Sequence, residues 1–296
     1  MNNGRLPEGW RNHSTKHPIA ACRLKRGDLK RLYKLINDKQ VEYRDRFLPL
    51  LVQQANETAE IFDARRKRVF DSFVTSMTIH ASNNELLHGN NDAFLEEENL
   101  PDRLMSILFD TGSVPTAIIG FTPPSRIVLF LDFRTQPLLD FSRVPTLPTL
   151  NESNYEITAD NHSWFAASNA TLGAFFKDRR TSVDWLHRAN LYDKLLFLIG
   201  LPLAIWADYR LSGHLGNAPT LPPIIISAIY IYVFMFALQI FRIFFFYSRW
   251  VFPKIELDSP SGSSPLRHRL SWLAVCLSVG AAFIYDVIKS ILGSSP

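Results

Sequence analysis

Two aspartates lie at or near the ends of predicted strands, and their carboxylates are suited to acid–base chemistry. Asp132 lies in Leu131-Asp132-Phe133, and Asp140 lies in Leu139-Asp140-Phe141. Paired carboxylates can bind a divalent cation or act as general acid and base. Aspartates that end strands and accept backbone hydrogen bonds are more common. A membrane-anchored enzyme that uses Asp132 and Asp140 is therefore an alternative hypothesis, and the leading one is a protein without enzymatic activity.

A second candidate lies in Asn161-His162-Ser163-Trp164, at the start of a predicted helix with Asp160 as its N-cap. Free N–H groups at a helix N-terminus attract anions, which makes His162 and Trp164 candidate ligand-binding residues. Helix capping explains the same residues without a ligand. The sequence shows none of the common motifs for phosphate binding, nucleophilic catalysis or metal binding. We therefore expect no metal and no cofactor.

The region that must position these residues is a predicted soluble α+β domain at residues 1–190. After an irregular start, Asp28 is expected to open an amphipathic helix. An apolar stripe from Leu48 to Phe62 predicts a second helix, which the basic run Arg65–Arg68 would end. The helix that follows Asp160 would lead into Val183–Lys194, a continuous helical connection toward the membrane.

Strand patterns predict a small mixed or antiparallel sheet in the same domain. Alternation over Phe73–Ile79, followed by turn residues, indicates a hairpin, and Arg103–Phe109 is a further strand. Arg126–Phe133 is almost entirely apolar, which is typical of a central strand covered on both faces. Pro137–Phe141 is a candidate edge strand, and residues 142–153 are expected to form a loop.

The remaining residues, 191–296, predict an all-α transmembrane module. Leu221–Phe241 contains no ionisable residue and is long enough to cross a hydrocarbon core of about 30 Å. A second span is expected at residues 270–288. Leu195–Ala207 is only 13 residues long, so it is either part of a span over 195–211 or an interfacial helix.

Charge placement favours three spans. The loop from Arg242 to Arg269 is strongly cationic and is expected in the cytoplasm, whereas Leu211–Pro219 carries no Lys or Arg and is expected outside. The N-terminus shows no signal peptide, so an N-terminal domain in the cytoplasm requires 195–211 to cross. The compact architecture suits a bacterial inner membrane.

Polar and small residues of the spans are the candidates for functional contacts within the bilayer. An ionisable or amide group at depth suggests an ion path or a contact between helices, although positions near span ends allow charges to reach the headgroups. Small side chains allow close helix packing. The polar candidates are Asp208, Gln239, Arg242 and Asp286, and the small ones are Ser278, Gly280, Ala281 and Ala282.

These patterns predict an integral membrane protein whose cytoplasmic domain binds a ligand or protein partner. That domain would be coupled to a self-associating three-helix module, as in a sensor, effector or scaffold. The expected partners are the lipid bilayer and further copies of the chain or other membrane-complex subunits. A net charge of +4 does not indicate a nucleic-acid partner, because the cationic residues cluster beside the spans. A small channel or transporter subunit is the third hypothesis.

Overall fold

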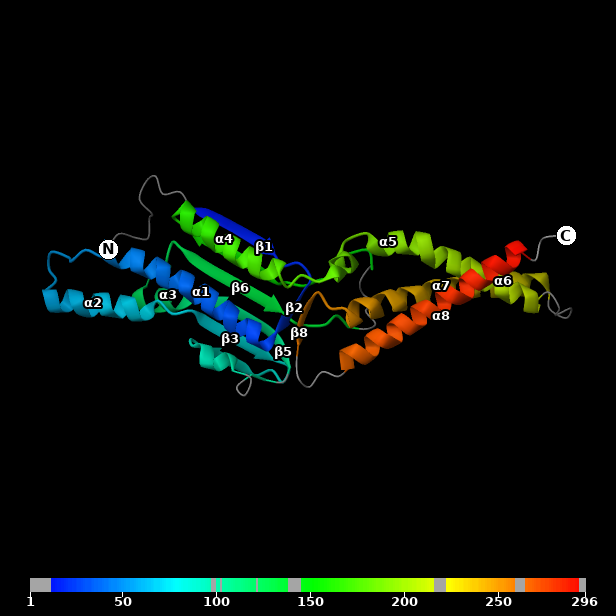
Figure 1. Ribbon diagram of the computed structural model, residues 1–296, viewed down its shortest axis with the longest axis horizontal. Helices are drawn as coiled ribbons and strands as arrows, with labels where there is room; N and C mark the ends of the chain where they lie inside the picture. Colours follow the sequence, from blue (N-terminus) through cyan, green and yellow to red (C-terminus); the bar gives the residue numbers. More distant parts are fainter. Residues whose placement is uncertain are drawn as a thin grey trace. The chain divides into compact units, whose positions relative to one another are not determined.

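The computed structural model describes residues 12–96, 100–101, 103–120, 122–137, 145–215, 222–258 and 264–292 (Figure 1). The chain forms two compact units. The first comprises Met1–Arg134, Asn151–Ser182 and Ile255–Ser261, and we call it the α+β unit. The second comprises Thr135–Leu150, Val183–Lys254 and Gly262–Pro296, and we call it the helical unit.

A six-stranded antiparallel sheet forms the centre of the α+β unit. Its strand order is β1-β7-β6-β5-β3-β4, with every neighbouring pair antiparallel. The prediction of a small mixed or antiparallel sheet is therefore confirmed in its antiparallel form. The strands are β1 (His13–Pro18), β3 (Ser76–Ala81), β4 (Leu86–Gly89), β5 (Leu104–Asp110), β6 (Arg126–Asp132) and β7 (Asn154–Ala159).

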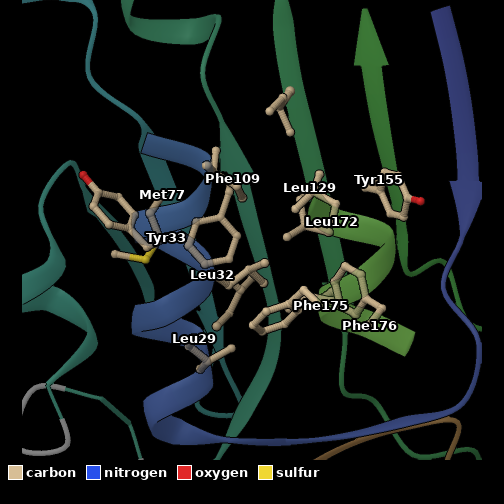
Figure 2. Packing of buried hydrophobic residues seen from close by; sticks show 14 of the residues in the cluster. Leu29, Leu32, Tyr33, Met77, Phe109, Leu129, Tyr155, Leu172, Phe175 and Phe176 are labelled. Atoms are coloured by element: carbon tan, nitrogen blue, oxygen red, sulfur yellow. The ribbon is translucent and has the colours of Figure 1, made fainter. Parts of the chain in front are cut away.

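Two helices pack on one face of this sheet and enclose the core (Figures 1 and 2). They are α1 (Arg26–Phe47) and α4 (His162–Lys177). Figure 2 shows Leu32 of α1 and Leu172 of α4 against Phe109 and Leu129 of the sheet. These side chains are almost fully buried, so their removal from water stabilises the layer packing. Shorter helices complete the unit: Leu48–Leu50 and Asp92–Leu95 are 3-10 helices, and α2 (Ala59–Ser72) and α3 (Ser113–Ile119) are α-helices.

A second, two-stranded sheet joins segments from opposite ends of the sequence. In it β2 (Cys22–Lys25) pairs in parallel with β8 (Ile255–Asp258). Arg23 reinforces the pairing through an ion pair with Asp258 at 2.7 Å. The strand β8 begins only three residues, 252–254, after the end of α7 (Pro223–Val251).

Among the described residues of the helical unit, three helices are long and apolar enough to cross a membrane, by length and composition. These candidate spans are Leu191–Gly213, Pro223–Val251 and His268–Lys289. The first span is built from α5 (Leu191–Leu195), a π-helical turn (Leu196–Gly200) and α6 (Leu201–Leu215), the second is α7, and the third lies within α8 (Ser264–Leu292). The short segment Leu195–Ala207 is thus part of a longer helical run.

A proline explains the π-helical turn in the first span. Pro202 has no N–H, so it cannot donate to the carbonyl of Leu198. The preceding turn widens, and the N–H of Leu201 donates to the carbonyl of Leu196. Wide turns of this kind keep a helix continuous while shifting the register of its faces.

Several sequence-based expectations for helices are wrong in detail. Leu48–Phe62 is not one helix, because a 3-10 turn and an irregular segment precede α2, whose N-cap is Thr58. Arg65–Arg68 consequently lies inside α2. Val183–Lys194 is not continuous either: a 3-10 helix, Ser182–His187, ends before Asn190, which adopts φ 60° ahead of α5. A left-handed residue cannot continue a right-handed helix.

The strand predictions are largely confirmed, with three differences. The segment at residues 12–26 is not irregular, because it contains β1 and β2. The central strand β6 is covered on one face only, because Ile127, Leu129 and Leu131 are buried while Val128 and Phe130 are half-buried. The candidate edge strand at Pro137–Phe141 lies largely outside the described residues.

Candidate functional site

Asp132, one of the two candidate catalytic aspartates, lies at the end of β6 and is held by its neighbours. Asp132 as a whole is only 3% exposed to solvent. Arg134 binds both carboxylate oxygens, with Nε 2.8 Å from Oδ1 and a terminal nitrogen 2.9 Å from Oδ2. The backbone N–H of Asp132 donates to Ser153 Oγ at 2.7 Å, and its carbonyl accepts from Asn151. These contacts hold the Asp132 carboxylate against Arg134, and Asp140 lies outside the described residues.

The candidate ligand-binding residues at the start of α4 occupy different environments. Trp164 is buried in the core, and its indole N–H donates to the carbonyl of Lys39 at 3.1 Å. His162 is exposed, with its ring 5.2 Å from that of His13. The N-cap is Asn161 and not Asp160, because the Asn161 side chain accepts the N–H of Trp164.

In the helical unit, Asp286 of α8 contacts α6 through two polar side chains. Its Oδ2 accepts the indole N–H of Trp206 at 2.9 Å and pairs with Nε of Arg210 at 3.2 Å. The ring of Trp206 also packs edge-on against Phe283. The ion pair and the hydrogen bond lower the free-energy cost of burying this carboxylate between apolar helices. They also fix the register of the two helices relative to each other. This cluster joins the first and third candidate spans.

The other polar candidates of the spans lie in different places. Oδ1 of Asp208 is buried and has no hydrogen-bond partner in the part of the chain that the structure describes. The guanidinium of Arg242 lies 5.8 Å from the centre of the Phe246 ring. Gln239 is exposed on the surface of α7.

The small residues of α8 lie on its exposed side. Ser278, Ala281 and Ala282 are exposed, and a Cβ added to Gly280 would meet no atom within 4 Å. The close contact between spans involves Gly200 instead. A Cβ there would lie 2.9 Å from Leu196 Cδ1 and 3.0 Å from Phe241 Cδ1. Sequence reasoning missed Gly200; its position two residues before Pro202 was the available signal.

Gly200→Leu should therefore destabilise the packing of the π-helical turn of the first candidate span against α7, whereas Gly280→Leu should not. The added side chain at position 200 has no room beside Phe241, and overpacking of this kind typically costs about 1–3 kcal/mol. The measurement is the free energy of unfolding in mixed micelles for both variants. Equal losses for the two glycines would contradict the packing seen at Gly200.

A buried arginine near the C-terminal end of α7 organises the start of the helical unit. Arg249 is 4% exposed and donates to four backbone carbonyls. The acceptors are Leu186 at 3.1 Å, Leu147 at 3.0 Å, and Pro145 and Arg188, each at 3.3 Å. Its guanidinium also lies 4.6 Å from the centre of the Phe245 ring. We call Arg249, these carbonyls and His187 the Arg249 cluster.

His187 is the titratable partner in this cluster. It is 5% exposed, and its Nδ1 lies 2.8 Å from Thr149 Oγ1. Burial, together with the positive charges of Arg249 and Lys254, lowers the pKa of His187 to about 4. The imidazole is consequently neutral at physiological pH. These contacts could not be predicted from the sequence, because the partners lie on segments that are 38 to 104 residues apart along the chain.

The described residues contain no group of three or more His, Cys, Asp or Glu side chains arranged to hold a metal ion. Comparison with models of known protein families, with curated proteins and with solved structures finds no match for this chain.

Proposed function

We propose that this chain is a multi-pass membrane protein that passes a binding event in a cytoplasmic domain to a self-associating helical module. The α+β unit would bind a ligand or protein partner, and the three candidate spans would respond as a sensor, effector or scaffold. A bacterial inner membrane suits this arrangement. Two features support this proposal: the exposed apolar surface of the long helices and the repeated chain connections between the two units.

The surface of the three long helices supports insertion in a bilayer. In both α7 and α8, the most hydrophobic stretch contains no residue that is buried inside the protein. In water, an apolar surface of this extent would drive aggregation, whereas hydrocarbon accommodates it. The charged side chains Asp286 and Arg210 are paired with each other.

The path of the chain supports coupling between the units. The chain passes from one unit to the other at residues 134/135, 150/151, 182/183, 254/255 and 261/262. Between α7 and β8 only residues 252–254 intervene. A connection this short transmits displacement better than a long flexible linker, whose ends move independently. A change in the sheet that contains β8 would therefore reach the end of α7.

The cytoplasmic location of the domain is part of this proposal and rests on charge. The segment from Arg242 to Arg269 contains five Lys or Arg residues, and Leu211–Pro219 contains none. The positive-inside rule places the first segment in the cytoplasm. With three spans, the N-terminal domain then lies on the same side.

Reporter fusions test this topology. We expect reporters inserted at Asn217 and at Ser261 of the full-length chain to be active on opposite sides of the membrane, with Ser261 in the cytoplasm. Alkaline extraction should leave the protein in the membrane fraction. Reporters on the same side, or recovery in the soluble fraction, would overturn the proposal.

A further inference from the structure

We infer that β8 is a releasable strand, whose pairing with β2 opens and closes while the six-stranded sheet stays folded, and that this step regulates the connection between the α+β unit and α7. The inference rests on the proposed function, because the connection matters only if the α+β unit signals to the helices. It adds the element that regulates the signal and the forces that keep this element paired.

The strands β2 and β8 match each other on both faces. One face carries apolar side chains that belong to the core or pack against it, in the register pairs Cys22–Ile255 and Leu24–Leu257. The other face carries cations on β2 opposite anions on β8, in the register pairs Arg23–Glu256 and Lys25–Asp258. This complementarity makes β8 a specific partner for β2, because a shifted register would place charges in the core.

The strand β2 is held in place by its other edge as well. The N–H of Arg23 donates to the carbonyl of Arg179 at 3.1 Å, and the N–H of Thr181 donates to the carbonyl of Ala21 at 2.8 Å. Among the strands with a described placement, β8 pairs with β2 alone. Release of β8 therefore leaves β2 in position and ready to pair again.

The forces that keep β8 paired are small compared with those that hold the main sheet. Each strand has only four residues, and a parallel pair of this length is marginally stable without further strands. Ile255, at 2% exposure, is the one fully buried side chain of β8, and its burial favours the paired state. Arg23 and Asp258 form an ion pair at 2.7 Å, but their side chains are 51% and 34% exposed, so water and salt weaken it. Opening of β8 therefore requires less free energy than unfolding of the α+β unit.

The chain on the other side of β8 is fixed within the helical unit. Arg249 binds four backbone carbonyls there, and the N–H of Phe252 donates to the carbonyl of Ser248 at 3.0 Å. Only residues 252–254 separate this fixed end of α7 from β8. While β8 is paired, the segment is held at both ends, and a displacement of β2 reaches α7. Once β8 is released, the same displacement no longer reaches the helix.

Amide hydrogen exchange of the full-length chain in lipid nanodiscs tests the release of β8. Arg23→Gln should raise the exchange rate of residues 252–258 about two- to fivefold, which is the effect expected from the loss of an exposed ion pair. Residues 240–249 of α7 and the strand β6 should keep the exchange rates of the parent. Arg65→Gln, which removes an ion pair with Glu57 elsewhere in the α+β unit, is the matched control and should leave residues 252–258 unchanged.

A disulfide between the two strands tests the same step in the opposite direction. Cys22 is a free, buried cysteine and is the register partner of Ile255, so Ile255→Cys in a Cys276→Ser background places two cysteines opposite each other. The spacing of paired strands lies within the range that a disulfide requires. The oxidised form should exchange at residues 252–258 about tenfold more slowly, or less, than the reduced form of the same variant. In the oxidised form, Arg23→Gln should have little further effect.

The outcomes separate this inference from the function on which it rests. Exchange at residues 252–258 that is unchanged by Arg23→Gln, or that rises equally in β6 and in residues 240–249, would overturn the inference, because β8 would not then open by itself. An oxidised disulfide that leaves this exchange unchanged would do the same. The proposed function fails on different evidence, namely reporters at Asn217 and Ser261 on the same side of the membrane or recovery of the chain in the soluble fraction.

Discussion

Arg249→Met is expected to lower the free energy of unfolding of the helical unit on the order of 3–5 kcal/mol, the typical cost of breaking a buried charged network. Methionine replaces the unbranched aliphatic stem of the arginine but leaves the carbonyls of Pro145, Leu147, Leu186 and Arg188 without the guanidinium donors. Each buried carbonyl without a partner is costly. Unfolding of the purified chain in mixed micelles, followed by tryptophan fluorescence, gives the measurement.

Two controls separate geometry from charge in this experiment. Arg249→Lys retains the positive charge, but a lysine cannot reach four carbonyls with its single amino group, so a substantial loss is still expected. Lys289→Met removes a charge from an exposed position on α8 and should change stability little. An Arg249→Met variant as stable as the parent would show that the Arg249 cluster does not hold these segments together.

Acidification is expected to destabilise the same part of the molecule through His187. The pKa of His187 is lowered to about 4 in the folded chain, against an ordinary value near 6.5. As the pH falls, His187 is therefore protonated in the unfolded chain before it is protonated in the folded chain. The contribution of His187 to the free energy of unfolding is fully present above pH 6.5 and is lost between pH 6.5 and 4. The shift corresponds to a loss of about 3 kcal/mol below pH 4.

A His187→Gln variant isolates this contribution. Glutamine does not titrate, so the free energy of unfolding of the variant should lose about 3 kcal/mol less than that of the parent between pH 6.5 and 4. At neutral pH the variant is expected to be less stable than the parent. His162→Gln, on the exposed surface of α4, should keep the pH profile of the parent. Parallel profiles for His187→Gln and the parent would contradict the burial of a neutral imidazole.

The Arg249 cluster buries one of the cations that indicate which side of the membrane the segment Arg242–Arg269 occupies. Arg249 counts toward the cationic segment that follows the second candidate span, yet its guanidinium is buried against carbonyls of the helical unit. Its role in the folded chain is to connect segments.

Features that depend on neighbouring residues along the chain can be predicted from the sequence. An uncharged apolar run such as Leu221–Phe241 identifies a candidate span from length and composition alone, and alternation around Met77 identifies a strand. Both signals are local, because a helix or strand exposes its faces with a fixed period. The start of α4 was predicted to within one residue for the same reason.

Contacts between residues far apart in the sequence could not be predicted and are known from the folded chain. The pairing of β2 with β8 joins positions more than 200 residues apart, and Arg249 reaches carbonyls between 61 and 104 residues away. No periodicity in the sequence encodes such contacts, since they arise from packing of elements that are each compatible with many arrangements. The same holds for the backbone of Asp132, whose N–H donates to Ser153 and whose carbonyl accepts from Asn151, 21 and 19 residues further along the chain.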